Sequence, residues 1–389
     1  MAHWPARGAA RRIRLAVALA SGLIGASATV QAAGPADVAT LDLRTWGEPL
    51  DTSAGFDRAS RAALLVYAST LHSLPPRDEA QLLTQLRIKR LNHASLTQWQ
   101  DGERARVWRN YQLASADCRA GDWSCVGPVG DFALLGEAAQ RALAGLGEEL
   151  AAWRGQLTAF SQAYLTEQMR LAALFPTVSS EIATFGSHEW SGDERDDRQF
   201  FLTFDDGPGA HTEATRVMLA QHGKTATFFV LGENLQARLK AQGAEALTRL
   251  YDGQCVASHG WEHRSHARWD DWQASVLTTR SLLLSALPQS TLLPLFRPPY
   301  GQRTADSGAF FAAQGIQVAL WNLDSQDWQR ALGADAIGTR MLALMLIKRR
   351  GVLLFHDVHG KARDALPGVF AALGEAVSWP DCRELAVRH

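Results

Sequence analysis

Short apolar runs alternate with helical stretches over the C-terminal half of the chain, and this alternation restricts the fold more than any other feature. Residues 200–204 and 226–231 are rich in aromatic and β-branched side chains, and a helical pattern near residues 214–221 separates them. Strands that alternate with helices predict a parallel sheet covered on its faces, in the form of a closed or nearly closed barrel. Further strands are expected at residues 254–257, 293–297, 317–322 and 351–355.

The N-terminal half has a different pattern, in which apolar residues from about residue 57 to 175 recur at helical spacing. The clearest stretch is residues 132–174, where they alternate by three and four, as in the seam of a coiled coil or a helical hairpin. An ordinary bundle core would give the same pattern. No catalytic constellation stands out in this half, so its role could be structural, or it could bind a protein partner. The seam residues are Leu143, Leu146, Leu150, Trp153, Leu157, Phe160 and Tyr164.

Length and charge set the outer limits. The chain has 389 residues, which exceeds the roughly 250 residues at which single hydrophobic cores stop growing, so two domains are expected. The polar, acidic stretch 186–197 suits an exposed linker between a mostly helical domain, residues 34–185, and a second domain, residues 198–389, that contains the predicted sheet. The net charge of -1 provides no basic surface for nucleic acid, which we exclude as a partner.

The N-terminus has the features of an export signal in residues 1–33. Arginines precede an apolar run over residues 15–24, and small residues lead to a cleavage site after Ala32 or Ala33. A retained anchor helix is the alternative, although glycines interrupt the run. Cleavage would leave no stable membrane span and would place the protein in the periplasm or outside the cell. The arginines are Arg7, Arg11, Arg12 and Arg14.

Export would place the four cysteines in an oxidising compartment, where they can pair. Cys118 and Cys125 are close enough in sequence to close a small loop, which would leave Cys255 and Cys382 as a second pair. Three pairings are open, and so is a single bridge with two free, buried thiols.

Two carboxylates and two imidazoles form the first candidate site. Asp205 and Asp206 follow a predicted strand and precede a Gly-Pro turn, where the backbone can bend and bring both carboxylates to one site, although such sequences are also common in exposed turns. If their segment is helical, His259 and His263 lie one turn apart on one face, the spacing with which two imidazoles bind one metal ion. Asp206 is a reasonable third ligand, which predicts a hydrolytic rather than a structural metal site.

Three further polar segments follow: Arg-Pro-Pro-Tyr-Gly at 297–301, Asp-Ser-Gln-Asp-Trp at 324–328 and Leu-Phe-His-Asp at 354–357. With the segments around Asp205 and His259 they resemble, in the same order, the five sequence motifs of the polysaccharide deacetylase family, also called the NodB homology domain or carbohydrate esterase family 4. The resemblance covers roughly residues 198–375. It implies an α/β fold, a distorted (β/α) barrel of the NodB type, preceded here by the mostly α-helical N-terminal domain.

The resemblance also implies a role for individual residues. Asp205 would be the general base and His356 the general acid. Arg297 would orient or stabilise Asp205, and Asp324 would pair with and tune His356. The backbone N–H of Tyr300 would complete an oxyanion site. The metal ligands would be Asp206, His259 and His263, and the walls of the acetyl pocket would be Trp328 and Leu354.

The implied reaction is removal of N-acetyl groups from an N-acetylhexosamine-containing polysaccharide, either peptidoglycan or an exopolysaccharide. One divalent ion, zinc or a similar metal, would lower the pKa of its bound water and polarise the carbonyl. Asp205 would take the proton of that water, while His356 must be protonated to serve the leaving amine, and a nearby carboxylate favours that form. A base and an acid in opposite protonation states predict a bell-shaped pH profile.

Three alternatives have different strengths. An esterase that removes O-acetyl groups from polysaccharides would use the same residues, so only an assay separates the two activities. A non-catalytic carbohydrate-binding or scaffold protein would not need a base and an acid around a metal. A two-metal phosphodiesterase would need a second cluster of ligands, which the sequence does not offer.

Overall fold

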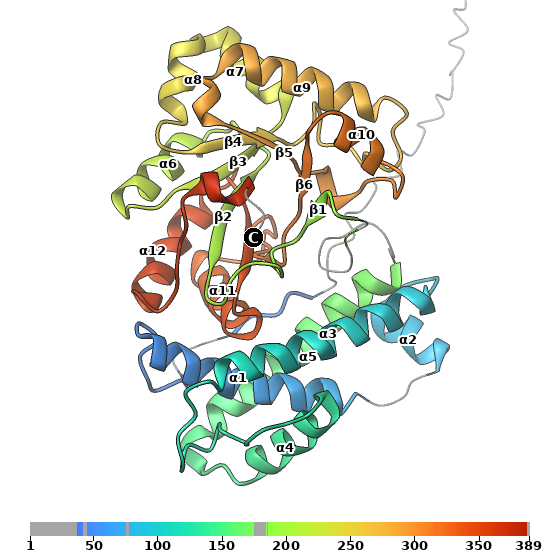
Figure 1. Ribbon diagram of the computed structural model, residues 1–389, viewed down its shortest axis with the longest axis vertical. Helices are drawn as coiled ribbons and strands as arrows, with labels where there is room; N and C mark the ends of the chain where they lie inside the picture. The colour runs from blue at the N-terminus through green and yellow to red at the C-terminus, as the bar shows by residue number, and fades with distance from the viewer. Residues whose placement is uncertain (1–36, 42–44, 75–77, 175–183, 185, 387–389) are drawn as a thin grey trace, which may run out of the picture. The chain divides into compact units, whose positions relative to one another are not determined.

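A curled sheet of parallel strands organises the C-terminal half of the computed structural model, which describes residues 37–41, 45–74, 78–174, 184 and 186–386. Within these residues the sheet has eight strands in the order β1-β6-β5-β4-β3-β2-β8-β7, and no pairing joins β1 to β7, so the barrel stays open (Figure 1). The predicted distorted (β/α) barrel is confirmed. The strands are β1 (Glu189–Trp190), β2 (Phe200–Asp205), β3 (Ala226–Val230), β4 (Cys255–Ser258), β5 (Leu292–Phe296), β6 (Gln317–Ala319), β7 (Leu323–Asp324) and β8 (Gly351–His356).

Parallel pairing explains both the strand sequences and the position of the polar motifs. Every residue of β2 is buried, because helices cover one side of the sheet and core side chains fill the other, and strands of this kind read as continuous apolar runs. Because the strands are parallel, their carboxyl ends meet at one edge. There Asp205 is the register partner of His356 on β8, and Val230 is that of Ser258 on β4.

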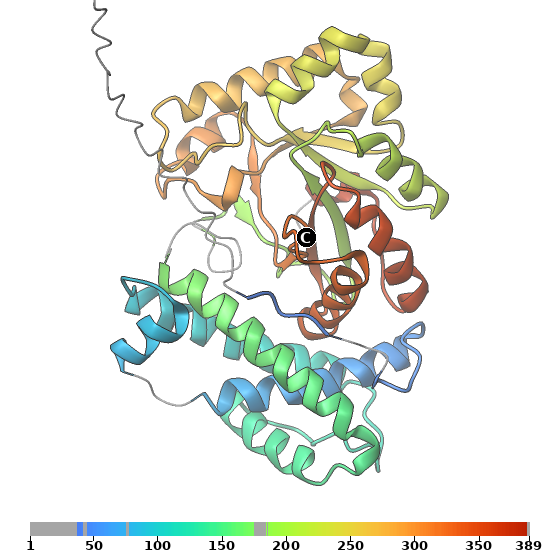
Figure 2. The same ribbon diagram turned by 180° about the vertical axis from the view of Figure 1, so that it is seen from behind.

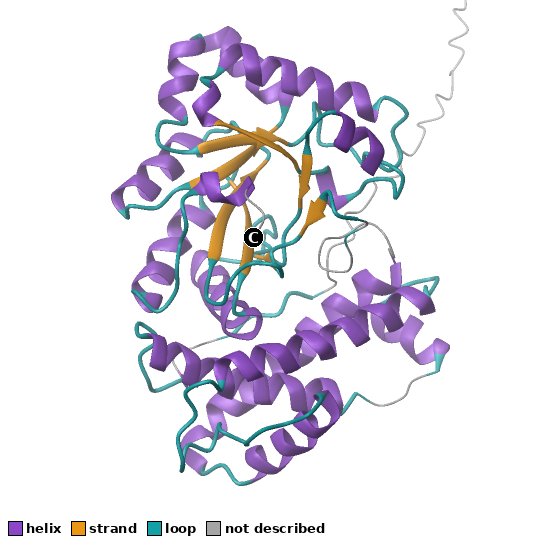
Figure 3. Ribbon diagram, viewed as in Figure 1, coloured by secondary structure: helices purple, strands orange, loops and turns teal. Residues whose placement is uncertain are grey.

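Helices cover the outer side of the curled sheet (Figure 3). Among them, α11 (Ala334–Lys348) is buried almost all round from Arg340 to Lys348, because it contacts α12 and β7 as well as the N-terminal helices. The others are α6 (Thr212–Gln221), α7 (Gly232–Gln242), α8 (Ala244–Leu250), α9 (Trp272–Ala286), α10 (Gly308–Ala313) and α12 (Lys361–Leu373).

The predicted helical character of the N-terminal half is confirmed. The central helix is α1 (Ser53–His72), which begins at the N-cap Thr52 and packs against α3, α4, α5 and α11. The predicted seam is interrupted by the 3-10 turn Glu148–Leu150, and its two parts, α4 and α5, each pack on α1 in a common bundle core. Figure 2 shows the same group of helices from behind. The remaining helices are α2 (Glu79–Leu86), α3 (His93–Ala114), α4 (Phe132–Ala144) and α5 (Ala151–Leu174).

The prediction of an exposed linker at residues 186–197 is wrong for part of that stretch. Glu189 and Trp190 form β1, pair with β6 and are buried. Arg195 is also buried, where its guanidinium donates to the Leu385 carbonyl and stacks over the Trp190 ring. The acidic composition of residues 186–197 predicted an exposed segment. The segment is partly buried instead, because polar side chains such as Arg195 have hydrogen-bond partners inside the protein.

Both disulfides that the spacing allowed are formed. Cys118 pairs with Cys125, and Cys255 of β4 pairs with Cys382 near the C-terminus. The predicted signal peptide, residues 1–33, lies outside the described residues. Among the helices that the structure describes, none is both long enough and apolar enough to cross a membrane.

Candidate metal and catalytic site

The turn after β2 brings both acidic residues of the first motif to one site. Asp205 is the last residue of β2 and is buried, and Asp206 has a positive φ of 75°, which bends the chain at the strand end as expected. The next residue must be glycine, because a Cβ at Gly207 would lie 2.4 Å from a carboxylate oxygen of Asp357. Asn234 of α7 donates its side-chain N–H to the Asp206 carbonyl at 2.8 Å and so helps to hold the turn.

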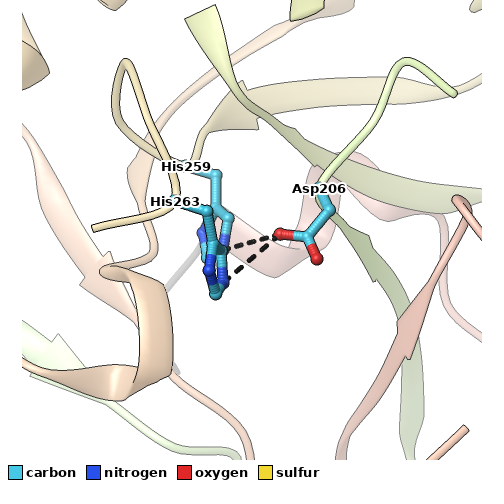
Figure 4. A group of neighbouring side chains, drawn as sticks. All are labelled: Asp206, His259 and His263. Carbon is cyan, nitrogen blue, oxygen red and sulfur yellow. Dashed lines mark ion pairs between the residues drawn. The ribbon is translucent and has the colours of Figure 1, made fainter. Parts of the chain in front are cut away.

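The two histidines of the second motif come together through a loop. Residues 259–263 are not helical, so the helical spacing considered for this segment does not apply. The chain leaves β4 and turns at Gly260, whose φ is +83° and whose missing Cβ makes room for the buried His266 ring. His259 Nε2 lies 3.4 Å and His263 Nε2 lies 3.5 Å from Asp206 Oδ1 (Figure 4).

The three side chains fit a divalent cation. Their ligand atoms all lie within 4.8 Å of one another. Asp206 Oδ1 is buried and has no hydrogen-bond partner among the described residues. Nδ1 of His259 lies 2.7 Å from the Arg297 carbonyl oxygen, which can only accept, so Nδ1 donates to it and Nε2 is the nitrogen that faces Asp206. Two imidazoles and one carboxylate with open positions are typical of a hydrolytic zinc site.

The charges of these groups favour an ionised carboxylate at Asp206. Burial alone would raise the pKa of Asp206, but the neighbouring imidazoles, His259, His356 and His263, hold it well below its usual range. Burial lowers the pKa of His263, against the attraction of Asp206. A neutral imidazole and an ionised carboxylate are the forms that bind a metal.

Arg297 contacts Asp205, as the resemblance implies. Its Nη1 donates to Asp205 Oδ1 at 2.9 Å and to Thr203 Oγ1 at 2.7 Å, and the guanidinium is fully buried. The rest of the guanidinium donates to the backbone carbonyls of Ala319 and Leu320. The second oxygen of Asp205, Oδ2, lies 3.7 Å from His259 Nε2, so it faces the metal ligands.

His356 pairs with Asp327, which corrects the expected pairing with Asp324. His356 Nδ1 lies 2.7 Å from Asp327 Oδ1, and the His356 backbone N–H donates to Asp327 Oδ2 at 2.9 Å. The reason is that β7 ends at Asp324 and the chain then turns at Gln326, which has a φ of 58°, so the second aspartate of the motif reaches the imidazole. The carboxylate of Asp324 instead accepts from the backbone and side chain of Gln326.

This pairing sets the protonation of the imidazole. Burial would lower the pKa of His356, but the charge and hydrogen bond of Asp327, helped by Asp206 and Asp205, raise it to about 10. The imidazole is therefore positively charged at neutral pH.

The predicted pocket residues lie around the same edge of the sheet. Tyr300 has a φ of 60°, is 37% exposed, and meets the His263 ring edge-on with 4.3 Å between centroids. Leu354 lies on β8 two residues before His356 and is buried, and Trp328 directly follows Asp327 and is half-buried. Their roles toward an acetyl group stay predictions.

Two residues near the site were not expected from the sequence. Asp327 is the second aspartate of the motif at 324–328, in which Asp324 was predicted to be the partner of His356. The sequence therefore did contain the correct residue type at that motif. The buried Asp357 accepts a hydrogen bond from Thr212, and burial raises its pKa to about 7. Its side chain fills the space beside Gly207, a contact that nothing in the local sequence indicates.

The fold and the site together define a parallel (β/α) protein with an Asp-His-His candidate metal site at the carboxyl ends of its strands. A family model described as polysaccharide deacetylase matches residues 192–319. A chitooligosaccharide deacetylase from Bradyrhizobium is 36% identical over 171 residues, which are 43% of this chain and 74% of that protein. The chain belongs to the polysaccharide deacetylase family.

Other relatives also match only part of this chain. A peptidoglycan-N-acetylglucosamine deacetylase from Bacillus cereus is 28% identical over 219 residues, 53% of this chain and 76% of that protein. The structure of a family 4 carbohydrate esterase from Streptomyces lividans superposes with a TM-score of 0.39 at 26% identity, over 46% of this chain and 90% of that one.

Proposed function

We propose that this protein hydrolyses the N-acetyl groups of a polysaccharide containing N-acetylhexosamine. The observation that carries the proposal is that an acid and a base, each fixed by a buried partner, flank the three candidate metal ligands. Arg297 holds Asp205, and Asp327 holds His356. A protein that only binds carbohydrate does not require this arrangement, because binding involves no proton transfer and so needs neither a general acid nor a general base.

Asp205 serves as the general base. Arg297 takes one carboxylate oxygen and leaves Oδ2 facing the metal ligands, where it can accept the proton of an attacking water. A divalent ion held by Asp206, His259 and His263, which we propose to be zinc, would polarise the acetyl carbonyl and lower the pKa of water.

His356 serves as the general acid. Its pKa of about 10 keeps the imidazole protonated at neutral pH, so it can donate a proton to the amine as the C–N bond breaks. The backbone N–H of Tyr300 is the proposed donor to the oxyanion, and Trp328 and Leu354 are the proposed walls of the acetyl pocket. Water supplies the hydroxyl of the released acetate and one proton, so the products are acetate and a free amine.

The substrate class follows from the relatives. Those named above act, by their names, on chitooligosaccharides and on peptidoglycan N-acetylglucosamine. We propose peptidoglycan or a secreted exopolysaccharide as the polymer, and with it export to the periplasm or the cell exterior, which the two disulfides support.

The direct test is acetate release by the purified chain from N-acetylglucosamine oligomers and from peptidoglycan, before and after chelation and zinc restoration. We expect release that stops with chelator and returns with zinc, and that is absent in Asp205→Asn. No release from a folded, zinc-loaded sample would contradict the proposal. An acetylated xylan tested in parallel would then show whether the enzyme removes O-acetyl groups instead.

A further inference from the structure

A buried arginine connects the helical N-terminal half to the segment that carries Asp327. Arg340 lies on α11 and is 1% exposed. Its two terminal nitrogens donate to the carboxylate of Glu167 on α5, at 3.1 and 2.9 Å, and Nη1 also donates to the Ala39 carbonyl at 2.8 Å. Its remaining nitrogen, Nε, donates at 3.0 Å to the backbone carbonyl of Asp324.

The carbonyl that Arg340 binds is the starting point of the turn that positions the general acid. Asp324 ends β7, and its carboxylate accepts from the Gln326 backbone N–H at 2.9 Å. One residue later, Asp327 makes both of its contacts with His356. The path of the backbone from Asp324 to Asp327 therefore decides where the carboxylate stands relative to the imidazole.

The orientation of Arg340 depends in turn on Glu167. Both side chains are buried, and the guanidinium has no other carboxylate within ion-pair distance among the described residues. Burial raises the pKa of Glu167, against the charge and hydrogen bonds of Arg340. Removing one member of such a pair leaves an uncompensated buried charge, which is strongly destabilising. We therefore expect the Arg340 side chain to change its orientation when Glu167 loses its charge.

We infer that Glu167 and Arg340 are positioning residues for the acid of the active site, and that the helical half thereby holds the Asp324–Asp327 turn in its working conformation. The inference rests on the proposed function for its catalytic consequence. Its structural part, the dependence of the turn on Glu167, stands on the contacts alone.

A second buried ion pair provides a matched control. Glu103 of α3 lies 3.4 Å from Lys348, the last residue of α11, and both are buried. It also joins the helical half to α11, but Lys348 is eight residues beyond Arg340, or roughly 12 Å along a helix. No contact of Lys348 in the described residues reaches the 324–327 segment.

The test compares Glu167→Gln with Glu103→Gln by hydrogen exchange of individual backbone amides. Both variants keep the shape of the side chain and remove one buried charge from the contact with α11. We expect exchange of the Gln326 and His356 amides to rise about 10-fold or more in Glu167→Gln and to stay at the wild-type rate in Glu103→Gln. Equal rates in all three proteins, or equal acceleration in both variants, would overturn the inference.

Turnover gives the catalytic half of the test. We expect kcat of Glu167→Gln to fall about 10-fold, while KM and zinc content stay at wild-type values, because the acid is misplaced and the metal ligands are not. Arg340→Lys keeps a positive charge beside Glu167 but cannot also reach the Asp324 carbonyl, so its kcat should fall to the same extent. This variant replaces Glu167→Gln in the test if Glu167→Gln does not fold. If the wild-type protein shows no turnover, the proposed function is contradicted. The exchange rates would still show whether Glu167 and Arg340 position the Asp324–Asp327 turn.

Discussion

The contact between Asp327 and His356 determines whether the proposed acid carries a proton. Asp327 is fully buried and gives one oxygen to the imidazole and the other to the backbone N–H of the same residue. The imidazole thus has both a fixed orientation and a charge partner. A cation bound at Asp206 would lower the pKa of His356 from about 10 by repulsion, so the alkaline limit of activity should lie at or below that pH.

We predict that Asp327→Asn moves the alkaline limb of the kcat profile to lower pH by roughly one to three units. The sign follows from the shift, since the raised pKa of His356 keeps the acid protonated as pH rises, and removing its largest favourable charge lets the proton leave earlier. A profile of kcat between pH 6 and 10 measures the limb. Asp324→Asn should move the alkaline limb less than Asp327→Asn does. A larger shift in Asp324→Asn would indicate that Asp324, and not Asp327, is the partner of His356.

Metal affinity should depend on His263. We predict that His263→Ala weakens zinc binding by more than about 100-fold, because loss of a ligand costs more than loss of the partners around a ligand. Titration against a competing chelator measures this affinity. His222→Ala, at the end of α6, should bind zinc like the wild type, because within the described part of the chain His222 makes hydrogen bonds only to that helix. Unchanged affinity in His263→Ala would remove it from the ligand set.

At the scale of elements, the sequence predicted the strands that are three residues or longer, since their apolar runs are continuous. It missed β1 and β7, which have two residues each and are too short to show any period. A helix at the second motif would have placed His259 and His263 on one face, since residues four apart face the same way there. A loop that turns at Gly260 produces the same neighbours. The three residues of the candidate metal site were predictable by residue type, whereas the partner of His356 depended on the turn after β7.

The turn after β2 should not tolerate a side chain at Gly207. We predict that Gly207→Ala destabilises the protein by roughly 1–3 kcal/mol, because the new Cβ would meet the buried Asp357 carboxylate. Displacement of the turn should also reduce zinc affinity, since it carries Asp206. Thermal unfolding with and without zinc measures both effects. Gly102→Ala lies at an exposed position of α3, where the new Cβ would meet no atom within 4 Å beyond its own stretch of helix, and should instead be neutral or stabilising.

At the scale of the whole molecule, the two halves share one hydrophobic core cluster, which includes Phe56 of α1 and Leu344 of α11. The sequence predicted a helical half and a barrel half but no contact between them. Ion pairs such as Glu167 with Arg340 join residues 173 positions apart, and no periodicity in either segment indicates such a partner. The described residues, which begin at 37, belong to one compact unit that contains both the helices and the barrel.

The two disulfides should contribute unequally to the stability of this unit. Cys255–Cys382 closes a sequence separation of 127, and Cys118–Cys125 closes one of 7. The loss of chain entropy in the unfolded state grows with the logarithm of loop length, which gives about 5 kcal/mol for the long loop and about 2.5 kcal/mol for the short one. We therefore predict that the Cys255→Ser/Cys382→Ser variant loses about twice as much free energy of unfolding as Cys118→Ser/Cys125→Ser. Denaturant unfolding under oxidising conditions measures both losses. A larger loss for the short loop would mean that native contacts around Cys118, rather than chain entropy, determine the effect.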